Sequence, residues 1–109
     1  MSGNSVILRS EKEFRDSRFL EASLTAEGDL VIEGQDLGDT VEKYFGVREY
    51  EWVWTIRAGD IPVLLKALGS TSDVLTALSM RFTGDNAAEL KSFLDSNEIP
   101  HEVWSRMGD

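Results

Sequence analysis

The stretch DLVIEGQDLGDTVEKYFGVREYEWVWTIR (residues 29–57) carries the clearest strand pattern and the densest cluster of acidic residues in the chain. From residue 49 to residue 57 apolar and polar side chains alternate, which is the period of a β-strand with one buried and one solvated face. The apolar row is Tyr50, Trp52, Trp54 and Ile56. The polar row is Glu49, Glu51, Thr55 and Arg57, interrupted by Val53. We predict a strand whose aromatic row packs in the core, with an exposed, partner-binding indole as the alternative.

The residues before this strand predict a hairpin and a short helix. Apolar and polar side chains alternate over residues 19–25 and again over residues 30–33, and Gly28 lies in the turn-like segment between them. Another short strand is predicted over residues 5–8, whereas the charged residues 11–17 predict a loop or one helical turn. The sequence GQDLG (residues 34–38) is expected to break the strand. A short helix over residues 41–45, capped by Asp39-Thr40, should follow and end at Gly46.

The second half of the chain has helical spacing. A helix is predicted over residues 61–68, with Asp60 as its N-cap and Pro62 in its first turn. A second helix is predicted over residues 72–82. Asn86 and Glu89 have the spacing of a capping box for a third helix, and a last short strand is predicted within residues 99–104.

Strand signals therefore come first and helix signals come after. This order favours the α+β class, with an antiparallel β-sheet meander in the N-terminal half and about three helices packed on one face from the C-terminal half. A chain of 109 residues without internal repeats or linkers is expected to form a single domain, residues 1–109.

The composition excludes several function classes. The chain has no cysteine, so disulfides and thiolate metal sites are excluded. Its net charge is −9, and residues 19–60 alone hold ten acidic and three basic residues. Such a charge disfavours nucleic acid and anionic membranes as partners and favours a basic protein. The opening residues lack the pattern of a secretory signal, and no apolar run approaches the length of a membrane span, so we expect a cytoplasmic protein.

No catalytic motif is present in the sequence. The single histidine, His101, follows Pro100 without a marked nucleophile nearby, and hydrolysis by His101 and carboxylates is the least favoured alternative. Asp36 and Asp39 lie in a glycine-flanked segment where a weak cation site is conceivable, but aspartates in turns usually bond their own backbone. We expect no enzyme activity, no cofactor and no metal.

The acidic cluster is the candidate binding surface. Acidic side chains crowd the 19 residues from Glu33 to Glu51, where only Lys43 and Arg48 are basic. If neighbouring strands pair, these acids would form a patch beside GQDLG that imitates the phosphates held by a basic cleft. The alternative is a solvated face that only maintains solubility. The residues expected to bind a partner are Gln35, Asp36, Asp39, Glu42, Glu49 and Glu51.

Four segments carry a resemblance to known proteins: GQDLG (34–38), EYEW (49–52), DIPVLLKALG (60–69) and IPHEVWSRMGD (99–109). With them the chain resembles a group of small acidic proteins common in actinobacteria. That group is similar in size and acidity to the immunity proteins that neutralise bacterial toxins. The resemblance implies a non-catalytic role such as that of an immunity protein that binds its toxin. It supplies no catalytic residues.

Two functional hypotheses follow. The first is a cytoplasmic immunity protein that blocks the basic active site of a toxin. The second is a structural or regulatory interaction module that works as a homo-oligomer. An exposed tryptophan or a free edge strand would favour this second hypothesis.

Overall fold

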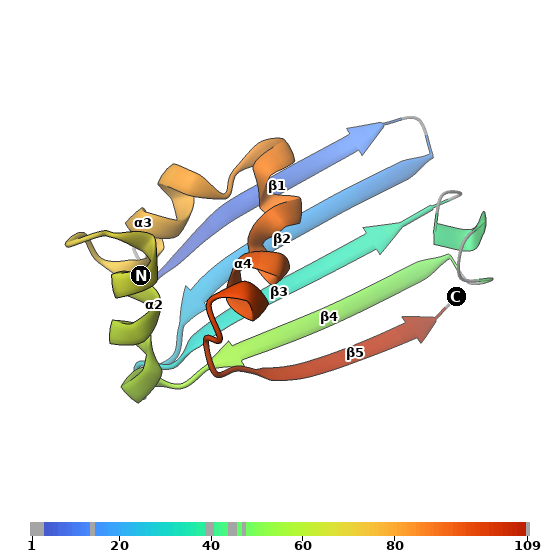
Figure 1. The fold of residues 1–109 in the computed structure, drawn as a ribbon. Coiled ribbons are helices and arrows are strands. Elements are labelled where there is room, and N and C mark those ends of the chain that lie inside the picture. The colour runs from blue at the N-terminus through green and yellow to red at the C-terminus, as the bar shows by residue number, and fades with distance from the viewer. Residues whose placement is uncertain (1–3, 14, 39–40, 44–45, 47, 109) are drawn as a thin grey trace.

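The computed structural model describes residues 4–13, 15–38, 41–43, 46 and 48–108. Within these residues, five antiparallel strands form one sheet in the order β1-β2-β3-β4-β5, so each strand pairs with its neighbours in sequence (Figure 1). The strands are β1 (Ser5–Glu13), β2 (Asp16–Leu24), β3 (Leu30–Leu37), β4 (Glu49–Ile56) and β5 (Glu102–Gly108). Strands β1 and β5 form the two edges.

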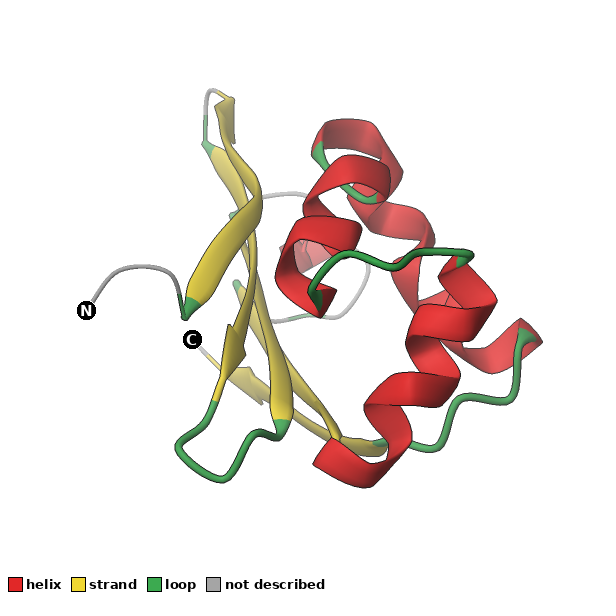
Figure 2. Cartoon of the chain, turned by 90° about the vertical axis from the view of Figure 1, so that its left-hand side faces the viewer, coloured by secondary structure: helices red, strands yellow, loops and turns green. Residues whose placement is uncertain are grey.

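The segment between β4 and β5 contains a run of helices that lies on one side of the sheet (Figure 2). They are η1 (Ala58–Asp60), α2 (Ile61–Leu68), α3 (Val74–Arg81), η2 (Gly84–Glu89) and α4 (Leu90–Ser96). The predicted α+β class, with a meander sheet covered by helices on one face, is confirmed. No helix in the described part of the chain is long and apolar enough to cross a membrane.

The core lies between the sheet and the helices. From the sheet it takes buried side chains such as Leu20, Ile32 and Ile56, and from the helices it takes Leu64 and Leu90. On β4, Trp52 and Trp54 pack against this core and are half-buried. Their aromatic row is therefore part of the packed face, as the alternation predicted.

The first hairpin is longer than predicted. Residues 11–17, expected to form a loop or helical turn, extend β1 to Glu13 and start β2 at Asp16. Across the hairpin Glu11 pairs with Arg18. Pairing with a neighbouring strand satisfies the backbone groups of this polar segment, which its side-chain pattern alone does not indicate.

The expected strand break at residues 34–38 is also wrong. Strand β3 continues to Leu37, and Gly34 pairs with Leu20 on one side and with Trp52 on the other. Both glycines of GQDLG are buried. Residues 41–43 are helical and Gly46 has a φ of 79°, as expected for a helix end, whereas Tyr44 and Phe45 lie outside the described residues.

The helix starts differ from the predictions in two places. Asp60 occupies the N-cap position of α2 but its side chain makes no capping hydrogen bond, because the 3-10 turn η1 leads directly into the helix. Asn86 and Glu89 do not form a capping box: residues 84–89 form the 3-10 helix η2, and α4 begins at Leu90. Helix α3 begins at Val74, with Asp73 as its N-cap.

Asp73→Ala should lower the Tm by about 3–6 °C, because the variant loses the carboxylate that accepts hydrogen bonds from the first turn of α3. Asp73 accepts hydrogen bonds from the backbone N–H of Thr76 at 3.0 Å and from its hydroxyl at 2.7 Å. The backbone bond is the main cause that lowers the pKa of Asp73. This contribution should therefore be lost as the pH falls through that lowered pKa. Asp60→Ala, at an N-cap without a side-chain bond, is the control; equal losses would contradict the assignment.

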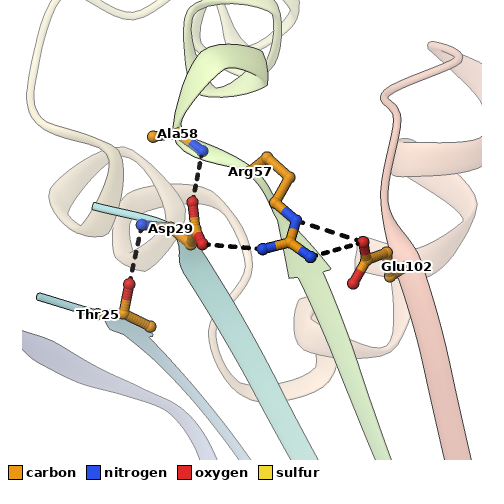
Figure 3. A network of polar contacts seen from close by, with 5 residues as sticks. All are labelled: Thr25, Asp29, Arg57, Ala58 and Glu102. Carbon is orange, nitrogen blue, oxygen red and sulfur yellow. Dashed lines mark hydrogen bonds and ion pairs between the residues drawn. The ribbon is translucent and has the colours of Figure 1, made fainter. Parts of the chain in front are cut away.

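One end of the sheet is held by a polar network (Figure 3). Arg57, just after β4, donates to Glu102 at the start of β5 at 2.9 Å and to Asp29 at 3.3 Å. Asp29 also accepts from the backbone of Ala58 at 2.9 Å, and its own backbone N–H donates to Thr25 at 3.1 Å. The network connects the β2–β3 turn to the strand that returns from the helices, and it thereby positions β5 along β4.

Candidate binding surface on the open face of the sheet

The face of the sheet turned away from the helices carries two rows of side chains that cross all five strands. Alternation places them opposite the buried residues Leu20 and Ile32. One row is Ile7, Glu21, Glu33, Val53 and Trp104. The next row is Ser10, Phe19, Gln35, Glu51 and Arg106. We call the face that these ten residues define the open face.

The centre of the open face is hollowed. Phe19, Val53 and Trp104 line a depression of about 390 Å³ together with Glu21, Glu33, Gln35 and Glu51. Trp104 remains 52% exposed and Ile7 54% exposed. Large exposed apolar side chains surrounded by charged groups are typical of a protein-binding surface.

Three of the predicted residues converge beside this hollow. The Gln35 amide donates to Glu49 at 2.8 Å and to Glu51 at 3.0 Å. Arg106 approaches Glu51 at 3.0 Å and Glu49 at 3.8 Å. The pKa of Glu51 is lowered, first by a hydrogen bond with Glu49 and then by Arg106 and Gln35, so Glu51 is ionised at neutral pH. This part of the face is a preorganised set of carboxylates, partly neutralised by one arginine.

The other predicted residues lie elsewhere. Asp36 follows Gln35 in the strand and therefore points to the opposite, helix-covered side, level with Arg18 and Tyr50 on the neighbouring strands. Glu42 lies beyond β3 and forms an ion pair with Arg48 at 3.3 Å. Asp39 lies outside the described residues. The acidic cluster is thus divided between at least two surfaces, although its members are close in sequence.

Asp36→Asn should stabilise the protein at pH 7, by less than about 1 kcal/mol because the side chain keeps some contact with water. Burial raises the pKa of Asp36, and the nearby Arg18 and Arg9 offset only part of that effect. The folded state therefore holds its proton to higher pH than the unfolded state, so wild-type stability rises as the pH falls through the raised pKa. Urea unfolding between pH 4 and 7 should show the gain from Asp36→Asn shrinking toward low pH; a constant difference would contradict it.

Several residues of the open face were not predicted from the sequence. Val53 was the single interruption of the polar row of β4, and that interruption is the signal that could have identified the hollow, because Val53 lies in it. Phe19 lies on β2, where it belongs to the open face with Glu21. Trp104 carried no signal of its own, since its position depends on β5 pairing with β4.

The ring of His101 is largely buried and contacts two neighbouring groups. Its side chain is 9% exposed, Nδ1 lies 2.6 Å from the carbonyl of Ile99, and Nε2 lies 3.1 Å from the ammonium of Lys91. The carbonyl needs a donor and the ammonium supplies one, which assigns the proton to Nδ1. Both ring nitrogens are engaged. Among residues that the structure describes, no three His, Cys, Asp or Glu side chains group to hold a metal ion.

Comparison with known proteins gives no match to any family model, curated protein or solved structure.

Proposed function

We propose that this chain is a non-catalytic binding protein that uses the open face of its sheet to bind a protein with a basic surface. In its most concrete form, the proposal is a cytoplasmic immunity protein that covers the basic active site of a bacterial toxin. The group of small acidic proteins that the sequence resembles is consistent with this role. Binding alone would block the toxin, without chemistry by the immunity protein.

The observation that carries the proposal is the combination of acidic and exposed apolar side chains on the open face. Glu21, Glu33 and Glu51 line the hollow together with Trp104, and Glu49 lies on the same face of β4 as Glu51. The carboxylates complement a basic partner and accelerate its approach. A large aromatic residue supplies the apolar contact that an interface needs at its centre. Asp36 and Glu42 lie away from this face and are not required by the proposal.

The partner should be sought with immobilised protein, from lysate of the source cell and from the products of neighbouring genes, first at low and then at high salt. Capture of a basic protein that salt releases would support the proposal. If the only captured protein is this chain itself, the proposal would fail in favour of the oligomeric alternative below.

Charge reversal by Glu49→Lys and Glu51→Lys together should slow association with that partner about tenfold at low salt, because electrostatic steering is lost. The difference should shrink at high salt, where the charges are screened. Glu27→Lys with Glu98→Lys changes the net charge equally at exposed positions away from the open face and is the matched control. Stopped-flow or surface-binding kinetics would measure both; equal association rates for the two double variants would rule out the open face.

Trp104→Ala tests the apolar contact separately. It should raise the Kd for the same partner about 30-fold by faster dissociation, since buried aromatic anchors contribute about 2 kcal/mol or more to binding. This loss should persist at high salt. Trp104 is half exposed in the free protein, so the variant should fold normally. An unchanged Kd would remove Trp104 from the interface.

A second candidate function is an interaction module that works as a homo-oligomer, and the edge strand β5 favours it. Val103 and Met107 on this strand are 57% and 50% exposed. An edge strand with exposed apolar side chains is able to pair with the same strand of a second copy. Sedimentation over a range of concentrations tests this: a dimer abolished by Val103→Lys would support it, and a monomer at all concentrations would exclude it.

A further inference from the structure

A second cavity, of about 280 Å³, lies on the other side of the sheet, between strands β2–β4 and the segment η2–α4. One wall is aromatic and consists of Tyr50, Trp52 and Trp54 along β4. The ring of Trp52 lies 5.2 Å from that of Tyr50 and 6.1 Å from that of Trp54, centre to centre. The small side chains Ala87 and Ala88 of η2 line the cavity from the helical layer. The cavity is therefore apolar over much of its surface, and it shares Phe19 and Trp52 with the hollow of the open face.

The charged groups of this cavity are mainly basic. Arg9, Arg18 and Lys91 line it against the single carboxylate of Asp36, in a chain whose net charge is −9. Lys91 is held by Asp95 at 2.8 Å, and Arg9 contacts Glu11 at 3.0 Å. In the described part of the molecule, Arg18 forms no ion pair within 4 Å. Since Arg9 and Lys91 already have carboxylate partners, Arg18 is the cation of this cavity that is left to attract an anion.

Two buried N–H donors of the cavity-lining residues have no partner among the described groups: Nε of Arg9 and Nε1 of Trp52. Both nitrogens are covered by protein atoms, and the Nε1 edge of the Trp52 indole lies against Gly34, so neither donor is on the accessible surface of the cavity. Asp36 does not bond to either of them.

We propose that this cavity binds a small aromatic carboxylate, with its ring against the indoles of Trp52 and Trp54 and its carboxylate toward Arg9 and Arg18. The volume is just below the roughly 300 Å³ at which pockets for drug-sized ligands begin, so the ligand has one ring rather than several. The aromatic wall gives the ring an apolar stacking surface, and guanidinium groups match carboxylates in geometry.

Phenylacetate is the probe, and its uncharged isostere phenylacetamide is the comparison ligand. The chain has three tryptophans, so three indole N–H resonances are expected in a ¹H–¹⁵N spectrum of the folded protein. Trp104→Phe and Trp52→Phe assign them. Phenylacetate should shift the Trp52 resonance saturably below about 10 mM, whereas Trp104, on the opposite face, is an internal control that should not move.

Two variants that change the cavity charge in opposite directions complete the test. Arg18→Gln should weaken phenylacetate binding about tenfold, and Asp36→Asn should strengthen it several-fold. Lys66→Gln, at an exposed position on α2 outside the cavity, makes the same charge change as Arg18→Gln and should leave the affinity unchanged. Arg18 is itself exposed, so its replacement should not disturb folding.

Three results would overturn the proposal. The first is no saturable shift of the Trp52 resonance in that range. The second is an equal response to phenylacetamide, which would remove the role of the carboxylate. The third is an equal response to acetate, which would remove the role of the ring. None of these results bears on the binding of a basic protein by the open face, so the two proposals fail independently.

Discussion

Gly38→Ala should lower the free energy of unfolding by about 3–5 kcal/mol, a large share of the 5–15 kcal/mol that is typical of a domain. Gly38 follows β3 with a φ of 119°, a conformation that side chains of L-residues rarely adopt. A Cβ there would lie 2.1 Å from the carbonyl oxygen of Arg15 and 2.8 Å from Cα of Asp16. Because both are backbone atoms of the β1–β2 hairpin, neither can move without displacing the hairpin.

Urea unfolding measures this loss, with Gly59→Ala as the matched control. A Cβ at Gly59 meets no heavy atom within 4 Å, and its φ is not in the positive range. Its replacement should therefore be neutral or slightly stabilising, by up to about 1 kcal/mol. A loss below about 1 kcal/mol for Gly38→Ala would contradict the close approach of the hairpin to the end of β3.

Gly34→Ala should destabilise the protein by about 2–3 kcal/mol through a different mechanism. The backbone at Gly34 is ordinary extended strand, but a Cβ would lie 2.1 Å from Cε2 and Cζ2 of the Trp52 indole. The indole lies across the bare glycine between Tyr50 and Trp54. The indole is rigid and packs against the core, so a Cβ at residue 34 would force the ring out of its place in the aromatic row.

A double-mutant cycle isolates this contact. In the Trp52→Ala background the indole is absent, and Gly34→Ala should then cost less than about 1 kcal/mol, as expected for adjacent residues that share one packing site. The near-ultraviolet circular dichroism of Gly34→Ala should also change, because the arrangement of the three rings changes. If the cost of Gly34→Ala is the same with and without the indole, then Trp52 does not lie over Gly34.

These two glycines explain why GQDLG was misinterpreted from the sequence. Glycine indicates a turn when only local conformation is considered, and that interpretation led to an expected loop with exposed acids. In the structure one glycine accommodates an indole from β4 and the other accommodates backbone from the β1–β2 hairpin. Both neighbours belong to other strands, so the reason for each glycine is tertiary.

The candidate site was predicted in part for the same reason. Glu49 and Glu51 share a face of β4 by the period of two, and Gln35 joins them through the pairing of β3 with β4. Asp36, adjacent to Gln35, was grouped with them by sequence proximity but lies on the other face. Trp104 enters the site only because β5 returns to pair with β4 after the helices.

The sequence by itself therefore determined the elements whose signal is local. These are the alternating strands, the turn at Gly28, the helix that ends at Gly69, and the order of strands before helices that defines an α+β meander. Only the tertiary structure decided how far β1 and β3 extend, which acids share a surface, and that a basic aromatic cavity lies behind an acidic face. Side-chain period and turn chemistry act within a few residues, whereas strand pairing and packing join residues that the sequence separates.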